Sequence, residues 1–143
     1  MKIIARELAV KDAEAVNALS RQLGYPLTLT QTSQNIMAVL QSDDHTAFVA
    51  EYGNKIVGWI GAAQALMIEV MPHCEINGLV IDEHHRGIGV GKLLIDKVKK
   101  WAKEKGTDRI GLHCNVKRTD AHLFYQHLGF TELKQQKNFV MEL

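Results

Sequence analysis

The stretch EINGLVIDEHHRGIGVGKLLIDKVKKWA, residues 75–102, combines three patterns that decide the fold. An apolar run ends at Asp82, and three glycines at alternate positions, Gly87, Gly89 and Gly91, follow it. In the second half of the stretch apolar residues recur at spacings of three and four, the period of a helix with one buried face. The stretch therefore predicts a buried strand, a glycine-rich turn and an amphipathic helix in direct succession.

The composition is typical of one soluble globular domain. A chain of 143 residues can bury one core and is too short for two, so we expect a single domain over residues 1–143. Lys and Arg (17) nearly balance Asp and Glu (16), which gives no net field to attract nucleic acid. No apolar run is long enough to cross a membrane. We therefore expect neither nucleic acid nor a membrane as a partner.

The cysteines and histidines indicate the compartment and exclude one kind of site. Cys74 and Cys114 lie inside strand-like runs, which favours buried free thiols in a reducing cytoplasm over a disulfide framework. The seven histidines show no spacing typical of metal ligands. We expect a cytoplasmic protein without a metal.

Hydrophobic periodicity and turn residues divide the whole chain into elements of an α+β fold. The expected order is β-α-α-β-β-β-α-β-α-β-β, which predicts a mixed, mostly antiparallel central sheet flanked by helices rather than a doubly wound sheet. We expect Thr32 or Ser33 to cap the second helix, and Gly78 to mark a bulge or a close backbone approach inside a strand. The expected strands are 2–9, two strands over 45–66 joined at Gly53-Asn54, 73–82, 108–116 and a closing pair over 130–143; the expected helices are 11–24, 33–42, 90–105 and 119–129.

The glycine turn has the chemistry of an anion site. The first turn of a helix presents backbone N–H groups without intrahelical partners and about half a positive charge. Glycines lack a Cβ, so the backbone between Arg86 and Lys92 can approach a phosphate closely, and the Lys92 ammonium adds charge. A tight strand-to-helix turn needs only one glycine, so three glycines beside two cations favour a pyrophosphate site over a purely structural turn.

Two common phosphate-binding motifs do not fit this turn. A P-loop requires a glycine where Arg86 stands and Ser or Thr where Leu93 stands. A dinucleotide fingerprint, G-x-G-x-x-G, requires a third glycine where Lys92 or Leu94 stands. The turn therefore predicts neither a nucleoside-triphosphate loop nor a dinucleotide site.

The turn does match R-x-x-G-x-G, through Arg86, Gly89 and Gly91, and in this it resembles the coenzyme A signature of the GNAT superfamily of N-acetyltransferases. The segment AHLFYQHLGF, residues 121–130, is similar to a second hallmark of that family, and the order of elements is similar along the chain. The resemblance implies acetyl-CoA as co-substrate. It also implies that the backbone of Leu79, Val80 and Ile81 pairs with the pantetheine arm, and that the pyrophosphate loop comprises Arg86, Gly87, Ile88, Gly89, Val90, Gly91 and Lys92.

Acyl transfer to an amine needs a base, because a primary amine resembling a lysine side chain has a pKa of about 10.4. By the resemblance, Glu75 is the leading candidate, on the same strand as the implied pantetheine contacts. The alternative is a surface or paired strand carboxylate. Asn77 and His73 are the lesser candidates for the base.

The resemblance implies that Tyr125 lies near the thioester sulfur, where its phenol can protonate the departing thiolate. The alternative is a core aromatic residue. Many family members carry an asparagine seven residues before this tyrosine, and here that place is Arg118. Either Asn115 or Arg118 is therefore expected to contact the coenzyme.

These expectations describe an acetyl-CoA-dependent N-acetyltransferase that acts on a primary amine by direct attack in a ternary complex. The alternative is a non-catalytic acyl-CoA sensor or interaction module. The acceptor, a small molecule or a protein, is not identified by the sequence; the family's acceptor pocket corresponds to residues 21–33 and 62–71, with Tyr25, His73 and Glu75 as candidate lining residues. The terminal strands suggest a possible homodimer.

Overall fold

The structure, a computed structural model, describes residues 2–143. The chain divides into two compact units, Met1–Leu112 and His113–Leu143. The first unit contains the sheet and three helices, and the second contains one helix, α4 (Thr119–His127), and the segment after it.

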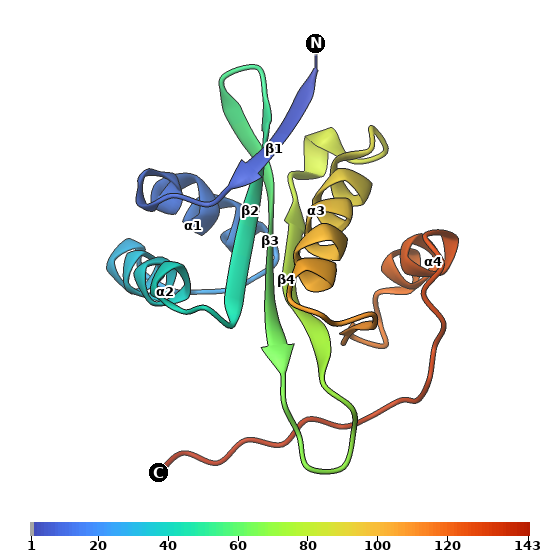
Figure 1. Cartoon of the computed structure of the whole chain (residues 1–143). Coiled ribbons are helices and arrows are strands. Elements are labelled where there is room, and N and C mark those ends of the chain that lie inside the picture. The colour runs from blue at the N-terminus through green and yellow to red at the C-terminus, as the bar shows by residue number, and fades with distance from the viewer. Residues whose placement is uncertain (1) are drawn as a thin grey trace. The chain divides into compact units, whose positions relative to one another are not determined.

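The first unit is built on a five-stranded sheet with the order β1-β2-β3-β4-β5 (Figure 1). Neighbouring strands are antiparallel except β4 and β5, which are parallel. The strands are β1 (Ile3–Glu7), β2 (His45–Tyr52), β3 (Lys55–Ala65), β4 (His73–Ile81) and β5 (Ile110–Leu112). The helices are α1 (Ala13–Gln22), α2 (Leu29–Gln41) and α3 (Val90–Glu104), with two short 3₁₀ turns, η1 (Val10–Asp12) and η2 (Glu83–His85). The α+β class and the mixed, mostly antiparallel sheet are confirmed.

Both faces of this sheet are buried, which fixes it as the middle of three layers. Helices α1 and α2 cover one face, where a buried cluster joins them to Ala47 and Val49 of β2. Helix α3 covers the other face (Figure 1). On that face a Cβ added to Gly58 would lie 3.0 Å from Cγ1 of Val90, the first residue of α3. The apolar side of α3 is buried through Val90, Leu94, Ile95 and Val98.

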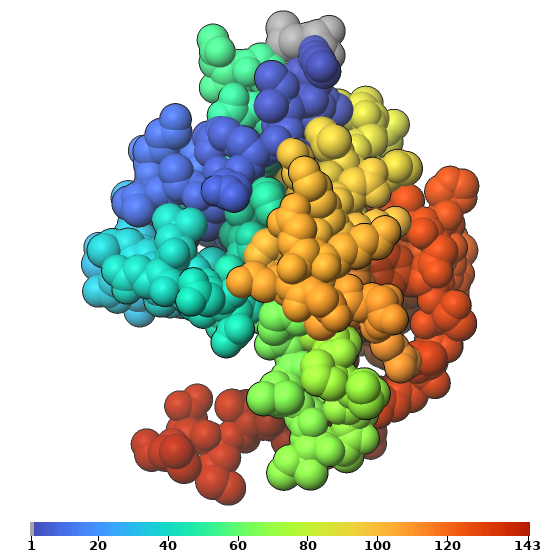
Figure 2. All heavy atoms as spheres, in the orientation of Figure 1, coloured from blue at the N-terminus to red at the C-terminus, as the bar shows by residue number. Residues whose placement is uncertain are grey.

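One loop of the first unit leaves the layers. Residues 66–72, between β3 and β4, extend past the helices as a projecting tip (Figure 2). Leu66, Ile68 and Met71 in this loop are almost fully exposed. The loop begins and ends next to the part of β4 that holds the candidate base.

The second helix begins earlier than its sequence suggested. Helix α2 starts at Leu29 and is capped by Thr28, not by Thr32 or Ser33. The Thr28 hydroxyl accepts from the Gln31 N–H at 3.1 Å, and the Gln31 carboxamide accepts from the Thr28 N–H at 2.9 Å. This reciprocal pair satisfies two otherwise orphaned donors, which a cap four or five residues later would not do.

The expected closing pair of strands over residues 130–143 is wrong. No helix or strand is assigned after α4 in the described chain, and the expected strand over 108–116 is reduced to the three residues of β5. A strand requires a neighbour that pairs with its N–H and C=O groups, and no ladder of the described residues includes a residue after Leu112. Leu133, Phe139 and Val140 are correspondingly exposed.

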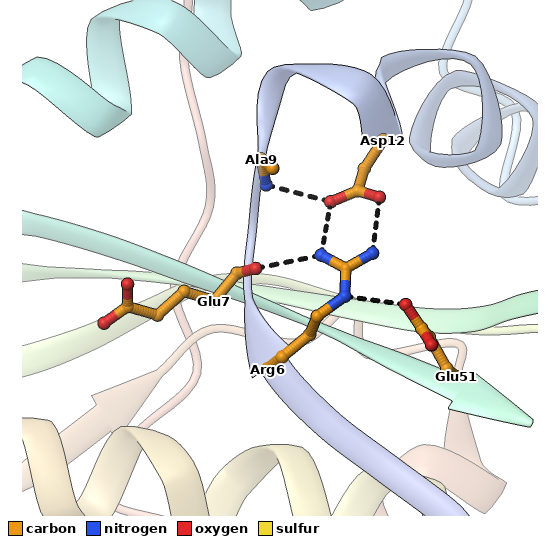
Figure 3. A network of polar contacts seen from close by, with 5 residues as sticks. All are labelled: Arg6, Glu7, Ala9, Asp12 and Glu51. Atoms are coloured by element: carbon orange, nitrogen blue, oxygen red, sulfur yellow. Dashed lines mark hydrogen bonds and ion pairs between the residues drawn. The ribbon is translucent and has the colours of Figure 1, made fainter.

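A charged network joins the first strand to the first helical turn (Figure 3). The guanidinium of Arg6 donates to both carboxylate oxygens of the buried Asp12 at 2.8 Å, and its Nε donates to Glu51 at 2.6 Å. Asp12 also accepts from the N–H of Ala9 at 2.9 Å. The pKa of Asp12 is lowered by the hydrogen bonds from Arg6, although burial acts in the opposite direction. This network holds β1, β2 and η1 together.

We predict that Arg6→Met lowers the free energy of unfolding by about 3 kcal/mol, because it leaves the buried Asp12 carboxylate without its partner. The pKa of Asp12 is depressed in the folded chain, so the pair stabilises the fold above the ordinary pKa of about 3.9 and this stability is lost as the pH falls. Urea titrations at pH 7 and pH 3 should therefore show a difference that is large at pH 7 and small at pH 3.

The matched control for this variant is Asp96→Asn, which breaks an exposed pair with Lys92 (2.9 Å) on α3. Exposed pairs contribute about 1 kcal/mol or less. An equal loss for both variants would contradict the assigned role of Arg6.

Candidate functional site

One extra residue in β4 shapes the centre of the candidate site. Gly61 of β3 pairs with Gly78, and Ala62 pairs with Ile76, so Asn77 has no partner and forms a bulge. The side chain of Asn77 lies over Gly61, where an added Cβ would meet its Oδ1 at 2.8 Å. Gly78 thus lies directly beside a bulge, one of the two features expected of it, and the ladder between β4 and β5 ends at the same point.

The ladder between β4 and β5 is short. It joins Cys74, Glu75 and Ile76 to the three residues of β5 and stops there. Beyond the bulge, the implied pantetheine contacts Leu79, Val80 and Ile81 pair with β3 on one side only. Their other side has no strand partner among the described residues, which leaves an edge that an extended ligand can join.

Gly78 permits a close approach by an aromatic ring. A Cβ at this position would lie 2.5 Å from Cη2 and 2.7 Å from Cζ3 of Trp59. The indole therefore lies directly over the backbone of the bulge. The role of Trp59 has no signal in the sequence, because nothing in the local pattern shows which cross-strand residue a glycine accommodates.

The glycine turn leads from β4 into α3 with the backbone geometry of an anion site. Gly87 and Gly89 have φ values of +79° and +93°, a region that other residues rarely adopt. Gly89 precedes α3, and its carbonyl accepts the N–H of Leu93. The N–H groups of Val90, Gly91 and Lys92 come before this bond and have no partner within the helix.

The side chains of the turn are arranged around this backbone. Arg86, Ile88 and Lys92 are exposed, whereas Val90 is buried against the sheet. The Lys92 ammonium lies 2.9 Å from Asp96, one helical turn further along α3. The exposed cations and the buried Val90 show that the turn is anchored by one apolar residue and presents its charge outward.

A cluster of hydrogen-bonded polar residues holds the chain between the end of β4 and the glycine turn. Asp82 is buried; it accepts from the Gln22 carboxamide at 2.9 Å and contacts the ring of His85. These hydrogen bonds, that of Gln22 first, lower the pKa of Asp82 against the effect of burial. The Gln22 oxygen also accepts the N–H of Glu83 at 3.2 Å. The roles of Gln22 and Asp82 were not predicted; their only signal in the sequence is an acidic residue directly after a buried strand.

Glu75 and His73 lie side by side on one face of β4. As residues i and i+2 they share that face, opposite Ala63 and Ala65 of β3. His73 Nε2 lies 3.0 Å from Glu75 Oε1, and His73 Nδ1 lies 3.1 Å from the carbonyl of Met71. The Glu75 hydrogen bond, followed by the Met71 carbonyl, raises the pKa of His73. The strand thus provides a carboxylate with an imidazole beside it.

The second unit holds the other catalytic candidate. Tyr125 lies on α4, half-buried, with Phe124 and Phe130 edge-on to its ring at 5.3 and 5.8 Å. Burial raises the pKa of Tyr125, so the phenol keeps its proton at neutral pH. This is the protonation state that a general acid requires.

Asn115 and Arg118 stand in the turn before α4. The Asn115 side chain accepts the N–H of Lys117 at 2.9 Å, and its carbonyl accepts the N–H of Arg118 at 3.0 Å. Arg118 is the exposed residue immediately before the helix. The Asn115 side chain serves the turn, whereas Arg118 presents an exposed guanidinium.

Other kinds of site find little support in the described part of the chain. Both cysteines are free, and burial raises the pKa of Cys74 to about 11, which makes this thiol a poor nucleophile. Among residues 2–143 no group of three or more His, Cys, Asp or Glu side chains is placed to hold a metal ion. No helix there is both long and apolar enough to span a bilayer.

Comparison with known proteins gives a consistent result. The sequence model of the acetyltransferase (GNAT) family matches residues 13–130. An uncharacterized N-acetyltransferase of Bacillus subtilis is 31% identical over 99 residues, 68% of this chain and 70% of that protein. One of Methanocaldococcus jannaschii is 31% identical over 104 residues, but the match covers only 46% of its length. The chain thus spans about half of some relatives.

Solved structures show the same fold. The aminoglycoside N-acetyltransferase AAC(6')-Iy, determined in complex with CoA, superposes with a TM-score of 0.88 at 20% identity. The superposition covers 99% of this chain and 96% of that one. At this identity the likeness concerns the fold.

The contact between Gly78 and Trp59 generates a prediction about stability. Gly78→Ala should destabilise the chain by about 1–3 kcal/mol, because the new methyl group forces the indole to move in a packed region. Trp59→Leu removes the ring atoms that the methyl group meets, so Gly78→Ala should cost much less in that background. Thermal unfolding of the two single variants and the double variant measures this coupling, and additive losses would contradict the contact.

Proposed function

The chain belongs to the GNAT family of acetyltransferases, and on this premise we propose that it transfers an acetyl group from acetyl-CoA to a primary amine by direct attack in a ternary complex. One observation carries the proposal. A single strand, β4, carries a carboxylate before its bulge and an open edge after it, and it then runs into a glycine turn at a helix N-terminus. The carboxylate suits an amine that must lose a proton, the open edge suits the extended arm of the thioester, and the glycine turn suits its phosphate groups.

The coenzyme is proposed to lie along the open edge of β4. The amide groups of its pantetheine arm would pair with the backbone of Leu79 to Ile81 as an added strand. Its pyrophosphate would accept from the N–H groups between Gly87 and Lys92, at the positive end of α3. Arg118 is the better candidate for a further phosphate contact, since the Asn115 side chain already accepts a backbone N–H.

The chemistry is proposed to use Glu75 and Tyr125. Glu75 removes a proton from the acceptor ammonium, and the neutral amine then attacks the thioester carbonyl. A backbone N–H of β4 near Leu79 to Ile81 would stabilise the oxyanion. Tyr125 protonates the leaving thiolate, for which its raised pKa keeps the phenol in the correct form.

The same proposal extends to the organisation of the protein. We expect both units to act as one N-acetyltransferase domain over residues 1–143, in the cytoplasm, where its free cysteines remain reduced.

A homodimer is proposed because several apolar side chains near the C-terminus are exposed: Leu133, Phe139, Val140, Met141 and Leu143. A monomer mass by light scattering at micromolar concentration would argue against the dimer.

The proposed activity is tested by thiol release from acetyl-CoA in the presence of kanamycin, spermidine and Nα-acetyl-lysine amide. These probes represent aminoglycoside, polyamine and protein-lysine acceptors. Amine-dependent release supports the proposal and ranks the acceptor classes. Tight acetyl-CoA binding without amine-dependent release from any probe would instead favour an acyl-CoA sensor.

We predict that Gly89→Ala weakens acetyl-CoA binding at least about tenfold, since charge-assisted hydrogen bonds to the pyrophosphate contribute about 1.5–3 kcal/mol each. A Cβ here meets no protein atom within 4 Å, so the expected loss comes from the added methyl group at the proposed phosphate site and not from a clash within the chain. The matched control is Gly24→Ala, which has a similar φ of +86° and equally open surroundings. Calorimetry should show weaker binding for Gly89→Ala alone; equal affinities would contradict the loop assignment.

We predict that Tyr125→Phe lowers kcat by about 10²–10⁴-fold, the usual contribution of a positioned general acid. The ring contacts with Phe124 and Phe130 remain, so the melting temperature should change little. The loss should shrink for acyl donors whose thiol is more acidic. A wild-type rate with a saturating amine, where chemistry limits turnover, would make Tyr125 a packing residue only.

A further inference from the structure

The imidazole of His73 contacts the carboxylate of the proposed base, Glu75. Its Nε2 faces the Glu75 carboxylate at 3.0 Å, and its Nδ1 faces the Met71 carbonyl at 3.1 Å. A carbonyl oxygen only accepts, so the hydrogen on Nδ1 is fixed by Met71 in every protonation state. The titrating position of the ring is therefore Nε2, the nitrogen that faces Glu75.

The strand next to β4 keeps the carboxylate against this ring. Gly111 of β5 pairs with Glu75, and a Cβ at Gly111 would lie 3.1 Å from Glu75 Oε1 and 3.7 Å from His73 Cδ2. The missing side chain provides the space in which the carboxylate and the imidazole meet. Both side chains are mostly buried, with 12% of His73 and 24% of Glu75 exposed.

We propose that His73 is the positioning partner that receives, through Glu75, the proton of the acceptor ammonium. The inference rests on the proposed function and deepens its base step. An N–H bond of the ammonium breaks as an O–H bond forms on Glu75; that O–H bond then breaks as an N–H bond forms at Nε2. Glu75 ends as a carboxylate, His73 ends as an imidazolium that still donates from Nδ1 to Met71, and the neutral amine attacks the thioester.

The relay reduces the large difference in pKa between a glutamate base and the acceptor ammonium. An isolated glutamate has a pKa of about 4.3, roughly six units below that of an alkylammonium, whereas an ordinary histidine stands about two units closer. Transfer onward to His73 therefore makes removal of the proton at least about a hundredfold less unfavourable. Glu75 still touches the substrate, and His73 acts only through it.

The pH dependence follows from the charges around the ring in the first unit. Glu75 and the Met71 carbonyl favour the imidazolium, whereas burial and the nearby Arg109 oppose it, and the pKa of His73 is raised overall. Only neutral His73 can accept a proton. Activity should therefore be low below this raised pKa and increase as the pH rises through it.

The first test requires no turnover. The His73 ring signals of the full chain, labelled with carbon-13 and assigned by their loss in His73→Gln, are titrated by NMR. His73 should titrate above the ordinary value of about 6.5 in the wild type and fall toward that value in Glu75→Gln. An identical His73 titration in both proteins would overturn the pair.

The second test is the pH profile of kcat/KM with the fastest amine among kanamycin, spermidine and Nα-acetyl-lysine amide. His73→Gln should lower the plateau at least tenfold and move the acidic limb at least one pH unit lower, with the affinity for acetyl-CoA unchanged. The matched control His45→Gln replaces an exposed histidine of β2 and should leave both unchanged.

The outcomes separate the relay from the proposed function. A wild-type limb and rate in His73→Gln would overturn the relay while amine-dependent turnover still supported the acetyltransferase. A wild-type enzyme that acetylates none of the probes would overturn the proposed function and, with it, the relay.

Discussion

The bulge at Asn77 is the constraint on which the candidate site depends. By adding one residue to β4, it changes the alternation of side chains between the two halves of the strand. Glu75 and His73 lie before the bulge, next to β5, and the open edge lies after it. Because β4 and β5 pair only before the bulge, β4 can hold a packed carboxylate there and present unpaired backbone after it. The Trp59 ring over Gly78 holds the bulge in this form.

The glycine turn is the second feature of the candidate site that depends on β4. At its end, Asp82 is buried and hydrogen-bonded to Gln22, and the chain then passes through η2 into the glycine turn. The turn itself has few buried side chains, so its shape is determined by positive φ values and by its two anchors, Asp82 and Val90. An exposed turn that is fixed at both ends can present N–H groups with little loss of conformational entropy on binding.

The sequence predicted best the features that depend on local pattern. The period of α3, the turn at Gly89 and the bulge near Gly78 all follow from residues within one element, and all are found. The strands over residues 130–143 failed because pairing is decided by a distant partner, which periodicity does not reveal. The predicted cap of α2 was wrong because Thr28, Thr32 and Ser33 can all cap a helix. Only the reciprocal contact with Gln31 distinguishes Thr28 from the other two.

In the candidate site, too, local patterns could be predicted from the sequence and contacts between distant residues could not. The alternation of a strand places His73 and Glu75 on one face, so their proximity was accessible from the sequence, and both were named as candidates. The link between Gln22 and Asp82 joins residues 60 positions apart and has no local signature. The assignments of Glu75, Tyr125 and the coenzyme-binding residues stay predictions, since they concern molecules that bind to the chain.

The link between Gln22 and Asp82 also bears on how such a chain can diversify. Gln22 is the last residue of α1, and residues 23–28 connect α1 to α2. Because the end of α1 is hydrogen-bonded to Asp82, directly after β4, substitutions after Gln22 can change the connection to α2 without disturbing the glycine turn that follows. The connection between α1 and α2 can thus vary in sequence while the glycine turn keeps its shape.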